Sequence, residues 1–318
     1  MSGKAPAVFR SLAEVPADFG PAVAAIGNFD GVHLGHQQIL AAAVAEAPIL
    51  DARSLAITFD PHPEQLLRPE QAPRLLTLMG DRIKLLAATG VDAILVLPFD
   101  ADLANTGARD FVESALVHRL KVCSLHEGGN FRFGRRAEAG VQELVHFGEE
   151  FGFAVHLHRA IRVHGLEVSS SATRSLVASG DVKGARWMLG RPFGVHATQT
   201  HDRGVGKRLL VPTINLAPYN GLLPAFGVYV SQLTIAGRCF QAVTNVGNRP
   251  TFASAGFSVE THILDFVPIE IAEDTPLYLE FLLRLRPEIQ WPSADALRAQ
   301  IFRDVARAKR YFRLCAAV

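Results

Sequence analysis

The sequence has few cysteines and almost no net charge, and each shortage excludes a class of protein. The three cysteines, Cys123, Cys239 and Cys315, include no Cys-x-x-Cys pair, so neither a disulfide framework nor a thiolate metal site is expected. Thirty-two basic and thirty-one acidic residues leave a formal charge of +1. A protein that binds a long nucleic-acid backbone usually carries a larger positive excess. We therefore expect no nucleic-acid partner.

Long apolar runs are also absent. The apolar stretch that begins at Ala93 has five residues, whereas a membrane-spanning helix needs about 20. The first residues lack the apolar core of a secretion signal. These features predict a cytoplasmic protein that does not associate with membranes. The hydrophobic share of 49% and the charged share of 20% are ordinary for a folded globular chain.

The first half of the chain alternates two kinds of apolar pattern. Short apolar runs predict strands, and apolar residues at helical spacing predict helices between them. The strands are expected at 22–29, 54–59, 92–99, 121–125 and 154–161, and the helices at 37–46, 81–89, 109–118 and 141–151. This alternation predicts a parallel α/β sheet with helices on both faces. Such sheets bind ligands at the carboxyl ends of their strands.

The second half has a different pattern. Its apolar runs at 226–235, 239–246, 259–266 and 277–285 are separated by Gly, Pro and Asn rather than by helical segments. They predict antiparallel strands in a small barrel or sandwich. An amphipathic helix is expected at 293–311, with Ser293 as its N-cap. The length suggests two domains, which we place at 1–186 and 187–318.

The densest motif is Gly-Asn-Phe-Asp-Gly-Val-His-Leu-Gly-His at 27–36, between the first predicted strand and helix. Glycines there let backbone amides approach a phosphate, and the helix N-terminus adds partial positive charge. His33 and His36 can donate hydrogen bonds to the same phosphate. The alternative is a pair of histidines that merely cap the helix. The position at a strand-to-helix turn favours the phosphate site.

Three further segments fit a nucleotide site. His62 lies between two prolines just after the second strand, where it could also simply hold a turn. Asn130 and Arg132 alternate with two phenylalanines after the fourth strand, giving a polar face and an aromatic face; core packing explains the phenylalanines equally well. The serines at 169–171 can cap a helix, and Arg174 in its first turn can reach a phosphate.

A glycine-containing loop in the second half ends in Pro-Thr-Ile-Asn at 212–215. Its backbone could donate to phosphates, and Thr213 and Asn215 could offer oxygen ligands to Mg²⁺. The loop is not a Walker motif, because no Gly-Lys-Ser/Thr ending follows. Taken by itself, the segment is better explained as an ordinary connection before a strand.

Together these motifs resemble the bacterial bifunctional riboflavin kinase/FAD synthetase family. Those of the first half resemble its FMN adenylyltransferase module. The segments 226–229, 245–252 and 259–266 recur in the order of its riboflavin kinase module. The resemblance implies an α/β nucleotidyltransferase domain with a Rossmann-like parallel sheet, followed by a six-stranded antiparallel β-barrel with a C-terminal helix. It also implies flavin biosynthesis, with riboflavin, FMN and ATP as small-molecule substrates and Mg²⁺ as cofactor.

The resemblance further implies a role for individual residues. His33, His36 and Glu260 are the expected catalytic side chains, and Thr213 and Asn215 the expected Mg²⁺ ligands. In the adenylyltransferase domain, ATP and flavin are expected at Gly27, Asn28, Phe29, Asp30, Gly31, His62, Asn130, Arg132, Ser169, Ser170, Ser171 and Arg174. In the kinase domain they are expected at Gly204, Gly206, Lys207, Pro212, Thr213, Asn215 and Arg249.

Glu260 is a chemically reasonable base, because the ribityl hydroxyl is too weak an acid to ionise near neutral pH. Strand alternation alone does not tell which way Glu260 points, and a solvent-facing carboxylate is the alternative. The chain has Leu210-Val211 where the family commonly has Gly-Phe. A rival interpretation is therefore an adenylyltransferase with a degraded, flavin-binding kinase domain.

Two other interpretations remain open from the sequence. A cytidylyltransferase or a pantetheine-type adenylyltransferase would share the first motif but would not need the second domain. A nucleic-acid-binding protein is disfavoured by the near-zero charge. His156 and His158 alternate along a predicted strand; with no third ligand in the sequence, we interpret them as surface or packing residues. A homo-oligomer is left open.

Overall fold

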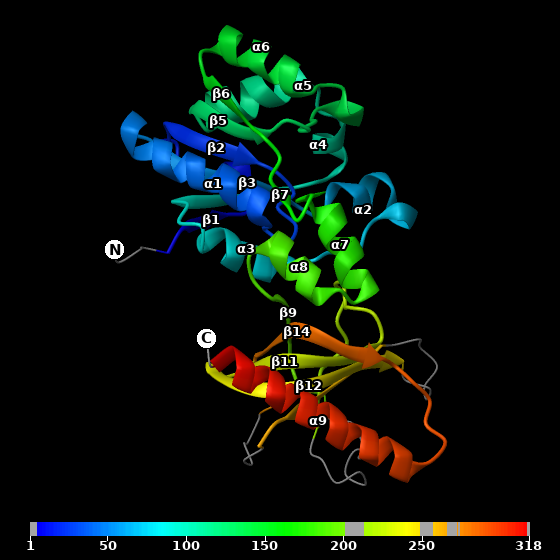
Figure 1. Cartoon of the computed structure of the whole chain (residues 1–318). Coiled ribbons are helices and arrows are strands. Elements are labelled where there is room, and N and C mark those ends of the chain that lie inside the picture. The colour runs from blue at the N-terminus through cyan, green and yellow to red at the C-terminus, as the bar shows by residue number, and fades with distance from the viewer. Residues whose placement is uncertain (1–4, 201–212, 249–256, 266–271, 273, 317–318) are drawn as a thin grey trace. The chain divides into compact units, whose positions relative to one another are not determined.

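The computed structural model describes residues 5–200, 213–248, 257–265, 272 and 274–316. By its internal contacts the chain forms two compact units, Met1–Ser170 and Ser171–Val318 (Figure 1). This division falls earlier than the domain boundary expected at 186/187, because the residues from Ser171 to Arg186 group with the second unit. The functional boundary stays a prediction.

The first unit is built on a six-stranded sheet with the spatial order β1-β4-β3-β2-β5-β6. All of its strand pairs are parallel. The strands are β1 (Ala7–Phe9), β2 (Ala22–Ile26), β3 (Arg53–Asp60), β4 (Ala93–Pro98), β5 (Val122–Gly128) and β6 (Ala154–His158). The parallel sheet expected from the apolar pattern is therefore confirmed, with β1 as an additional edge strand.

Helices cover both faces of this sheet, because its buried strands alternate between two apolar clusters. Along β2, Ala24 belongs to the cluster that includes Leu116 and Leu144, whereas Ala25 belongs to the one with Leu40 and Leu86. The first cluster packs α5 (Ala108–Phe111), its π-helical continuation Val112–Arg119, and α6 (Val141–Phe151). The second packs α1 (Leu34–Glu46) and α3 (Met79–Ala87). Short helices α2 (Pro63–Leu67) and α4 (Ala101–Asn105) complete the unit.

The strand order reverses between β2 and β5. From β2 the chain builds β3 and then β4 on one side, and then crosses to β5 on the other side. In open parallel sheets the loops diverge at such a switch point, and ligands bind there, outside the carboxyl ends of the strands. The segments that follow β2 and β5 contain those singled out in the sequence, residues 27–36 and 130–134.

The second unit holds a curled antiparallel sheet with the order β10-β13-β12-β11-β14-β9 (Figure 1). Its strands are β9 (Phe193–Ala197), β10 (Ile214–Asn215), β11 (Gly227–Ile235), β12 (Arg238–Asn248), β13 (Phe257–Ile263) and β14 (Leu277–Pro287). A bridge between Gln199 and Leu216 and a hydrogen bond from Thr200 N–H to the Asn215 carbonyl (2.9 Å) join the two edges. The six-stranded barrel is thereby confirmed, and β9 and β10 are strands that the sequence pattern did not reveal. Helix α7 (Ser170–Ser179) and helix α8 (Val182–Leu189) precede the barrel in the chain. The two-stranded ribbon of β7 (Arg162–Val163) and β8 (Leu166–Glu167) comes before them and belongs to the first unit.

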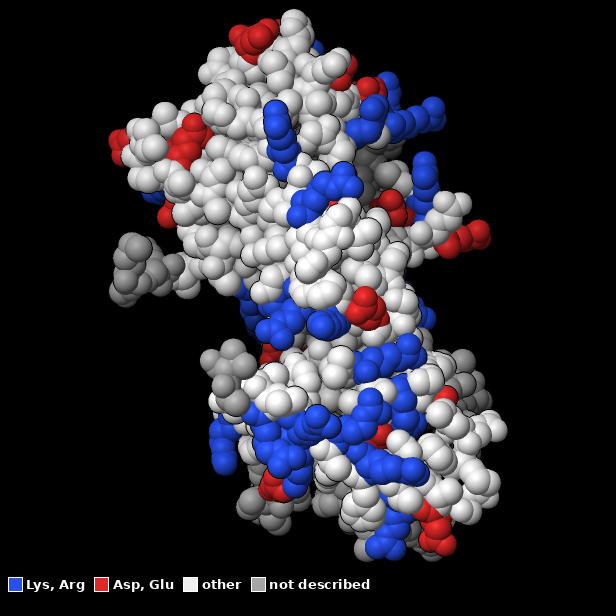
Figure 2. Space-filling model, in the orientation of Figure 1, with Lys and Arg blue, Asp and Glu red and all other residues white. Residues whose placement is uncertain are grey.

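Helix α9 (Ala294–Ala316) packs on the outside of the barrel. Ala308 and Phe312 lie in one apolar cluster with Val228 and Val230 of β11. Ser293 caps the helix through a hydrogen bond from Ala296 N–H to its hydroxyl (3.2 Å). The helix carries six Lys or Arg residues against two Asp, and Figure 2 shows basic side chains gathered over it. The net charge of the whole chain is only +1, but this helix is strongly basic. No helix in the described part of the chain is long and apolar enough to cross a membrane.

Candidate active sites

The two histidines of the first motif stack on each other at the start of α1. Their ring centroids lie 3.6 Å apart, with 17° between the planes. His33 is the N-cap, and its Nδ1 accepts the N–H of His36 (3.3 Å). The neutral ring therefore carries its proton on Nε2, the nitrogen that can donate to a phosphate oxygen. A Cβ at Gly35 would lie 3.2 Å from the His33 ring, so the glycine makes room for the stack. Capping accounts for His33 but not for His36.

The loop between β2 and α1 is held in an unusual backbone conformation. Phe29, Gly31 and Val32 have φ angles of 46°, 81° and 38°. The left-handed region is unfavourable for a β-branched residue such as Val32 and costs on the order of 1–3 kcal/mol. The loop is tied to β3 by hydrogen bonds from Gly27 N–H to the Ile57 carbonyl (3.0 Å) and from the Thr58 hydroxyl to the Asn28 carbonyl (3.2 Å). Strain of this kind is typical of ligand-binding loops.

Asp30 anchors this loop from inside the protein. Its fully buried carboxylate accepts the N–H groups of Leu76 (3.0 Å) and Thr77 (2.9 Å). The buried guanidinium of Arg82 lies 3.8 Å away. These contacts fix the position of the loop at 27–36, the expected phosphate turn. The expected contact of Asp30 with substrate stays a prediction. Thr77 and Arg82 could not be linked to the motif from the sequence, because both follow it by more than forty residues.

His62 caps helix α2 at the carboxyl end of β3. The ring Nδ1 of His62 accepts the backbone N–H of Glu64 (3.2 Å), and the backbone N–H of His62 donates to the Gln65 side-chain oxygen (3.2 Å). The side chain is only 4% exposed. The turn-holding role that the sequence left open is therefore real. Binding of substrate by the same residue stays a prediction.

The segment after β5 has the expected alternation. Asn130 and Arg132 are exposed, whereas Phe131 and Phe133 stack with centroids 5.3 Å apart and pack against the apolar core. Arg132 donates through Nε to the Ala137 carbonyl (3.0 Å). Core packing thus explains the aromatic face. The polar face is turned outward at the switch point, where a ligand would bind.

The serine-rich segment begins α7. The Ser170 hydroxyl donates to the Asp30 carbonyl (2.8 Å), and this hydrogen bond also holds the loop at 27–36 in place. Ser169 precedes the helix, and Ser171 and Arg174 lie in the second compact unit. The expected substrate contacts of Ser169, Ser171 and Arg174 stay predictions.

Glu127 is a buried acidic residue at the switch point that the sequence analysis did not single out. It lies next to the end of β5, is 2% exposed, and its carboxylate accepts the N–H of Ile26 in β2 (2.7 Å). It therefore ties the two strands together at the switch point. Burial raises the pKa of Glu127 well above its ordinary value. The hydrogen bonds from Ile26 and Gly128 lower this pKa, but the effect of burial is larger.

Glu127→Gln is expected to flatten the pH dependence of stability. Because the pKa of Glu127 is raised in the fold, the folded chain keeps a proton at pH values where the unfolded chain has released it. Wild-type stability must then fall as the pH rises from about 4.5 through the raised pKa. Glutamine cannot titrate but still accepts the Ile26 N–H, so the variant should lack this decline. Urea unfolding across a pH series measures it. The exposed Glu149→Gln is the control, which should decline like the wild type; an unchanged slope in Glu127→Gln would contradict the assignment.

In the barrel, three polar side chains form a row across neighbouring strands. Asn215 of β10 is directly opposite Glu260 of β13, which is in turn opposite Asn245 of β12. The next residue of β13, Thr261, is fully buried, whereas Glu260 is exposed. Glu260 therefore points out of the barrel interior, beside Asn215, in the solvent-facing orientation that the sequence analysis gave as the alternative. Its catalytic role stays a prediction. Ser258 donates to the Glu260 carboxylate (3.1 Å).

Asn215 has the features of a cation ligand. Its side-chain oxygen is buried and has no hydrogen-bond partner among the described residues. An amide oxygen is a ligand that Mg²⁺ accepts, and a carboxylate such as that of Glu260 is another. Thr213, the other expected ligand, directly precedes β10. The donors present thus fit a Mg²⁺ site.

Several expected residues of the kinase domain cannot be placed. Gly204, Gly206, Lys207, Pro212 and Arg249 lie outside the described residues, as does the Leu210-Val211 pair that departs from the family pattern. Their expected roles stay predictions.

The fold and the two groupings define a class of protein. One unit is a parallel α/β sheet with two stacked histidines at a helix N-terminus beside its switch point, and the other is an antiparallel barrel with Asn215 opposite Glu260 at one edge. A sequence profile described as FAD synthetase matches residues 15–172, and one described as riboflavin kinase matches residues 189–312. The chain belongs to the family of bifunctional riboflavin kinase/FMN adenylyltransferases.

Curated members of this family are similar over nearly their whole length. The protein from Pseudomonas fluorescens is 36% identical over 94% of this chain and 96% of its own. Those from Haemophilus influenzae and Escherichia coli K12 are 33% and 32% identical, over 90% and 96% of this chain and 93% and 96% of their own. All three are named bifunctional riboflavin kinase/FMN adenylyltransferase. The expected two-module enzyme is therefore confirmed.

A solved structure shares the fold. It is described as a macrolide-efflux protein from Streptococcus pneumoniae and superimposes with a TM-score of 0.86 over 96% of this chain and 99% of that chain. At 24% identity the likeness is one of fold alone.

Proposed function

We propose that the barrel transfers the γ-phosphoryl group of ATP to the ribityl hydroxyl of riboflavin, giving FMN and ADP. The parallel-sheet domain then joins the FMN phosphate to the α-phosphorus of a second ATP, giving FAD and pyrophosphate. The observation that carries this proposal is that each compact unit has its own grouping for phosphate chemistry. These are the stacked His33 and His36 at a helix N-terminus in one, and Asn215 beside Glu260 in the other.

In the first domain the chain's own groups act on the leaving pyrophosphate. An FMN phosphate oxygen bonds to the α-phosphorus of ATP as the bond from that phosphorus to the β-phosphate oxygen breaks. Negative charge then grows on the departing pyrophosphate. The Nε2–H of His33 and the N-terminal amides of α1 offset that charge, and they need little reorganisation because the stack and the cap already hold them.

In the barrel the chain's groups handle a proton and a cation. As the ribityl oxygen bonds to the γ-phosphorus, Glu260 accepts the hydroxyl proton, and ADP leaves. Thr213 and Asn215 would hold Mg²⁺, which neutralises phosphate charge when bound. Mg²⁺ would also accompany the ATP of the first domain.

The three cysteines are unpaired, which fits the reducing cytoplasm in which we place these reactions.

Asn215→Ala is expected to raise the Mg²⁺ concentration needed for half-maximal FMN formation by roughly tenfold, about 1.4 kcal/mol of lost binding. The variant removes the buried oxygen assigned to the cation. FAD formation from supplied FMN should keep its Mg²⁺ requirement, because it takes place in the other unit. Titrations of both reactions measure this. Asn220→Ala changes an exposed asparagine of the same unit and serves as the control. A parallel shift in both reactions would refute the assignment.

The proposed function is tested by incubating the protein with riboflavin, ATP and MgCl₂ and separating the flavins by chromatography over time. FMN should appear first and FAD should follow. Conversion of supplied FMN without conversion of riboflavin would favour the rival in which the kinase domain is degraded. If neither flavin changes, the proposed function is wrong.

A further inference from the structure

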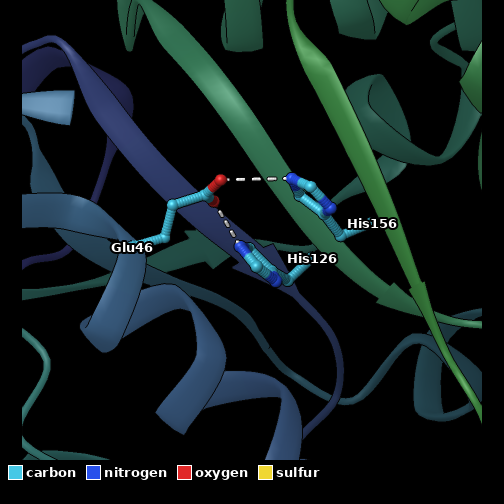
Figure 3. A group of neighbouring side chains, drawn as sticks. All are labelled: Glu46, His126 and His156. Atoms are coloured by element: carbon cyan, nitrogen blue, oxygen red, sulfur yellow. Dashed lines mark hydrogen bonds and ion pairs between the residues drawn. The ribbon is translucent and has the colours of Figure 1, made fainter. Parts of the chain in front are cut away.

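A second cluster of histidines lies on the first unit's sheet, away from the phosphate turn (Figure 3). Glu46, the last residue of α1, has one carboxylate oxygen 2.6 Å from Nε2 of His126 and the other 3.1 Å from Nε2 of His156. The ligand atoms of these three residues all lie within 4.8 Å of one another. They come from a helix and two strands, so the fold alone brings them together.

The sheet register explains the arrangement. His126 of β5 and His156 of β6 are directly opposite each other in a parallel pair, so their rings lie on the same face. The ring centroids are 4.8 Å apart, with 25° between the planes. Glu46 reaches this face from the end of α1, and the Ser124 hydroxyl donates to its carboxylate (2.6 Å). The third ligand that the sequence did not show is thus supplied by a residue eighty positions before His126.

We propose that Glu46, His126 and His156 bind a divalent transition-metal ion, Zn²⁺ in the first instance. Two imidazoles and one carboxylate are a donor set that proteins use for Zn²⁺, with a fourth position left to water. Imidazole suits Zn²⁺ and its neighbours in the transition series, whereas Mg²⁺ prefers oxygen. This site is therefore chemically distinct from the proposed Mg²⁺ sites.

The observed distances suit such an ion. In a tetrahedral site with metal–ligand bonds of about 2.1 Å, ligand atoms lie roughly 3.4 Å apart. Nε2 of His126 and Nε2 of His156 each lie near a different oxygen of Glu46, at 2.6 and 3.1 Å, and all three ligand groups lie within 4.8 Å of one another. Small side-chain movements can therefore bring them to the spacing that a bound ion needs. The ion takes the place of the hydrogens between these atoms. The His156 side chain is 47% exposed, which gives the ion a path from solvent.

His158 acts as a positioning residue. Its Nε2 lies 3.0 Å from Nδ1 of His126. When Nδ1 of His126 donates to His158, Nε2 of His126 presents its lone pair toward the ion. Metal-binding histidines usually have their other ring nitrogen held by such a partner.

The ion would act on the structure rather than on phosphate transfer. The thirteen residues from Leu34 to Glu46 make α1 about 20 Å long, so the cluster is at the far end of the helix from His33. A bound ion would join the end of α1 to β5 and to the edge strand β6. It would thereby stabilise the edge of the sheet.

The test is Zn²⁺ binding to tag-free, metal-stripped full-length protein by isothermal titration calorimetry, with Co²⁺ absorption as a spectroscopic check. One ion per chain is expected, and excess Zn²⁺ should raise the unfolding temperature. His156→Ala, which alters an exposed side chain, should weaken binding at least about 100-fold, and His158→Ala about 10–100-fold. Glu46→Gln is a second variant of the ligand set, and circular dichroism checks that each variant is folded. His118→Ala changes an exposed histidine elsewhere in the unit and should bind like the wild type.

The phosphate turn also contains histidines, so the site must be distinguished from it. His33→Asn should still bind one Zn²⁺ with the wild-type affinity, whatever its flavin chemistry. Absence of stoichiometric binding to the wild type would overturn the proposal. So would wild-type affinity in both His156→Ala and Glu46→Gln, or loss of the ion in His33→Asn.

Discussion

Replacing His33 with asparagine is expected to lower the rate of FAD formation from FMN by about 10²–10³-fold, the cost of removing one preorganised donor to developing charge. Asparagine is a good N-cap residue, so it can still accept the His36 N–H that His33 now accepts. The variant therefore keeps the start of α1 and removes only the imidazole donor. FMN formation from riboflavin should be unchanged, because it takes place in the other unit.

The stacked geometry makes a further expectation about the pair. His36→Ala should also slow FAD formation. The two rings are stacked with centroids 3.6 Å apart, so we expect both to act on the same pyrophosphate group. Residues that act as a unit are not additive. The double variant should therefore lose less than the product of the two single losses. If the two histidines acted independently, the loss in the double variant would equal the product of the two single losses.

Both rates are measured by chromatography, with saturating ATP and either FMN or riboflavin as substrate. His118→Asn makes the same chemical change at an exposed position of the first unit and should affect neither rate. If His33→Asn slows both reactions equally, the effect is structural. If it slows neither, His33 does not handle the pyrophosphate.

The regular parts of the fold could be predicted because their cause is local. The buried strands β2 to β5 are apolar runs, and α6 has apolar residues at helical spacing, so pattern alone indicates them. Strand β1 has three residues and β10 has two, too few for any period. These edge strands form because the neighbouring strands β4 and β13 offer them hydrogen bonds, which no local pattern records.

In the candidate site too, contacts between residues close in the sequence could be predicted, whereas contacts between distant residues could not. His33 and His36 share one helical turn, so their spacing in the sequence predicts their proximity. The Asp30–Arg82 contact and the Glu127–Ile26 hydrogen bond join residues 52 and 101 positions apart, as the numbering shows. Only the fold brings them together. Glu46 and His156 are further apart still, which is why the sequence analysis interpreted His156 as a surface or packing residue.

Glu260→Gln is expected to lower the rate of FMN formation by about 10²-fold or more, within the range that general-base catalysis contributes. Glutamine has nearly the same shape and can still accept the Ser258 hydroxyl hydrogen bond. It cannot take up the ribityl proton. Because the phosphoryl transition state is loose, the proton leaves late. The loss should therefore appear in kcat, with little change in the KM for riboflavin.

The position of Glu260 makes this variant a discriminating one. Its side chain is exposed on an otherwise regular strand, so the substitution should leave the barrel folded, and FAD formation from supplied FMN should proceed at the wild-type rate. Asp295→Asn removes another acidic group of the same unit, in the first turn of α9, and should leave both rates unchanged. A variant that loses FMN formation but still requires the wild-type Mg²⁺ concentration would identify Glu260 as the base. A higher Mg²⁺ requirement would instead make Glu260 a ligand beside Asn215, and an unchanged rate would place the base elsewhere.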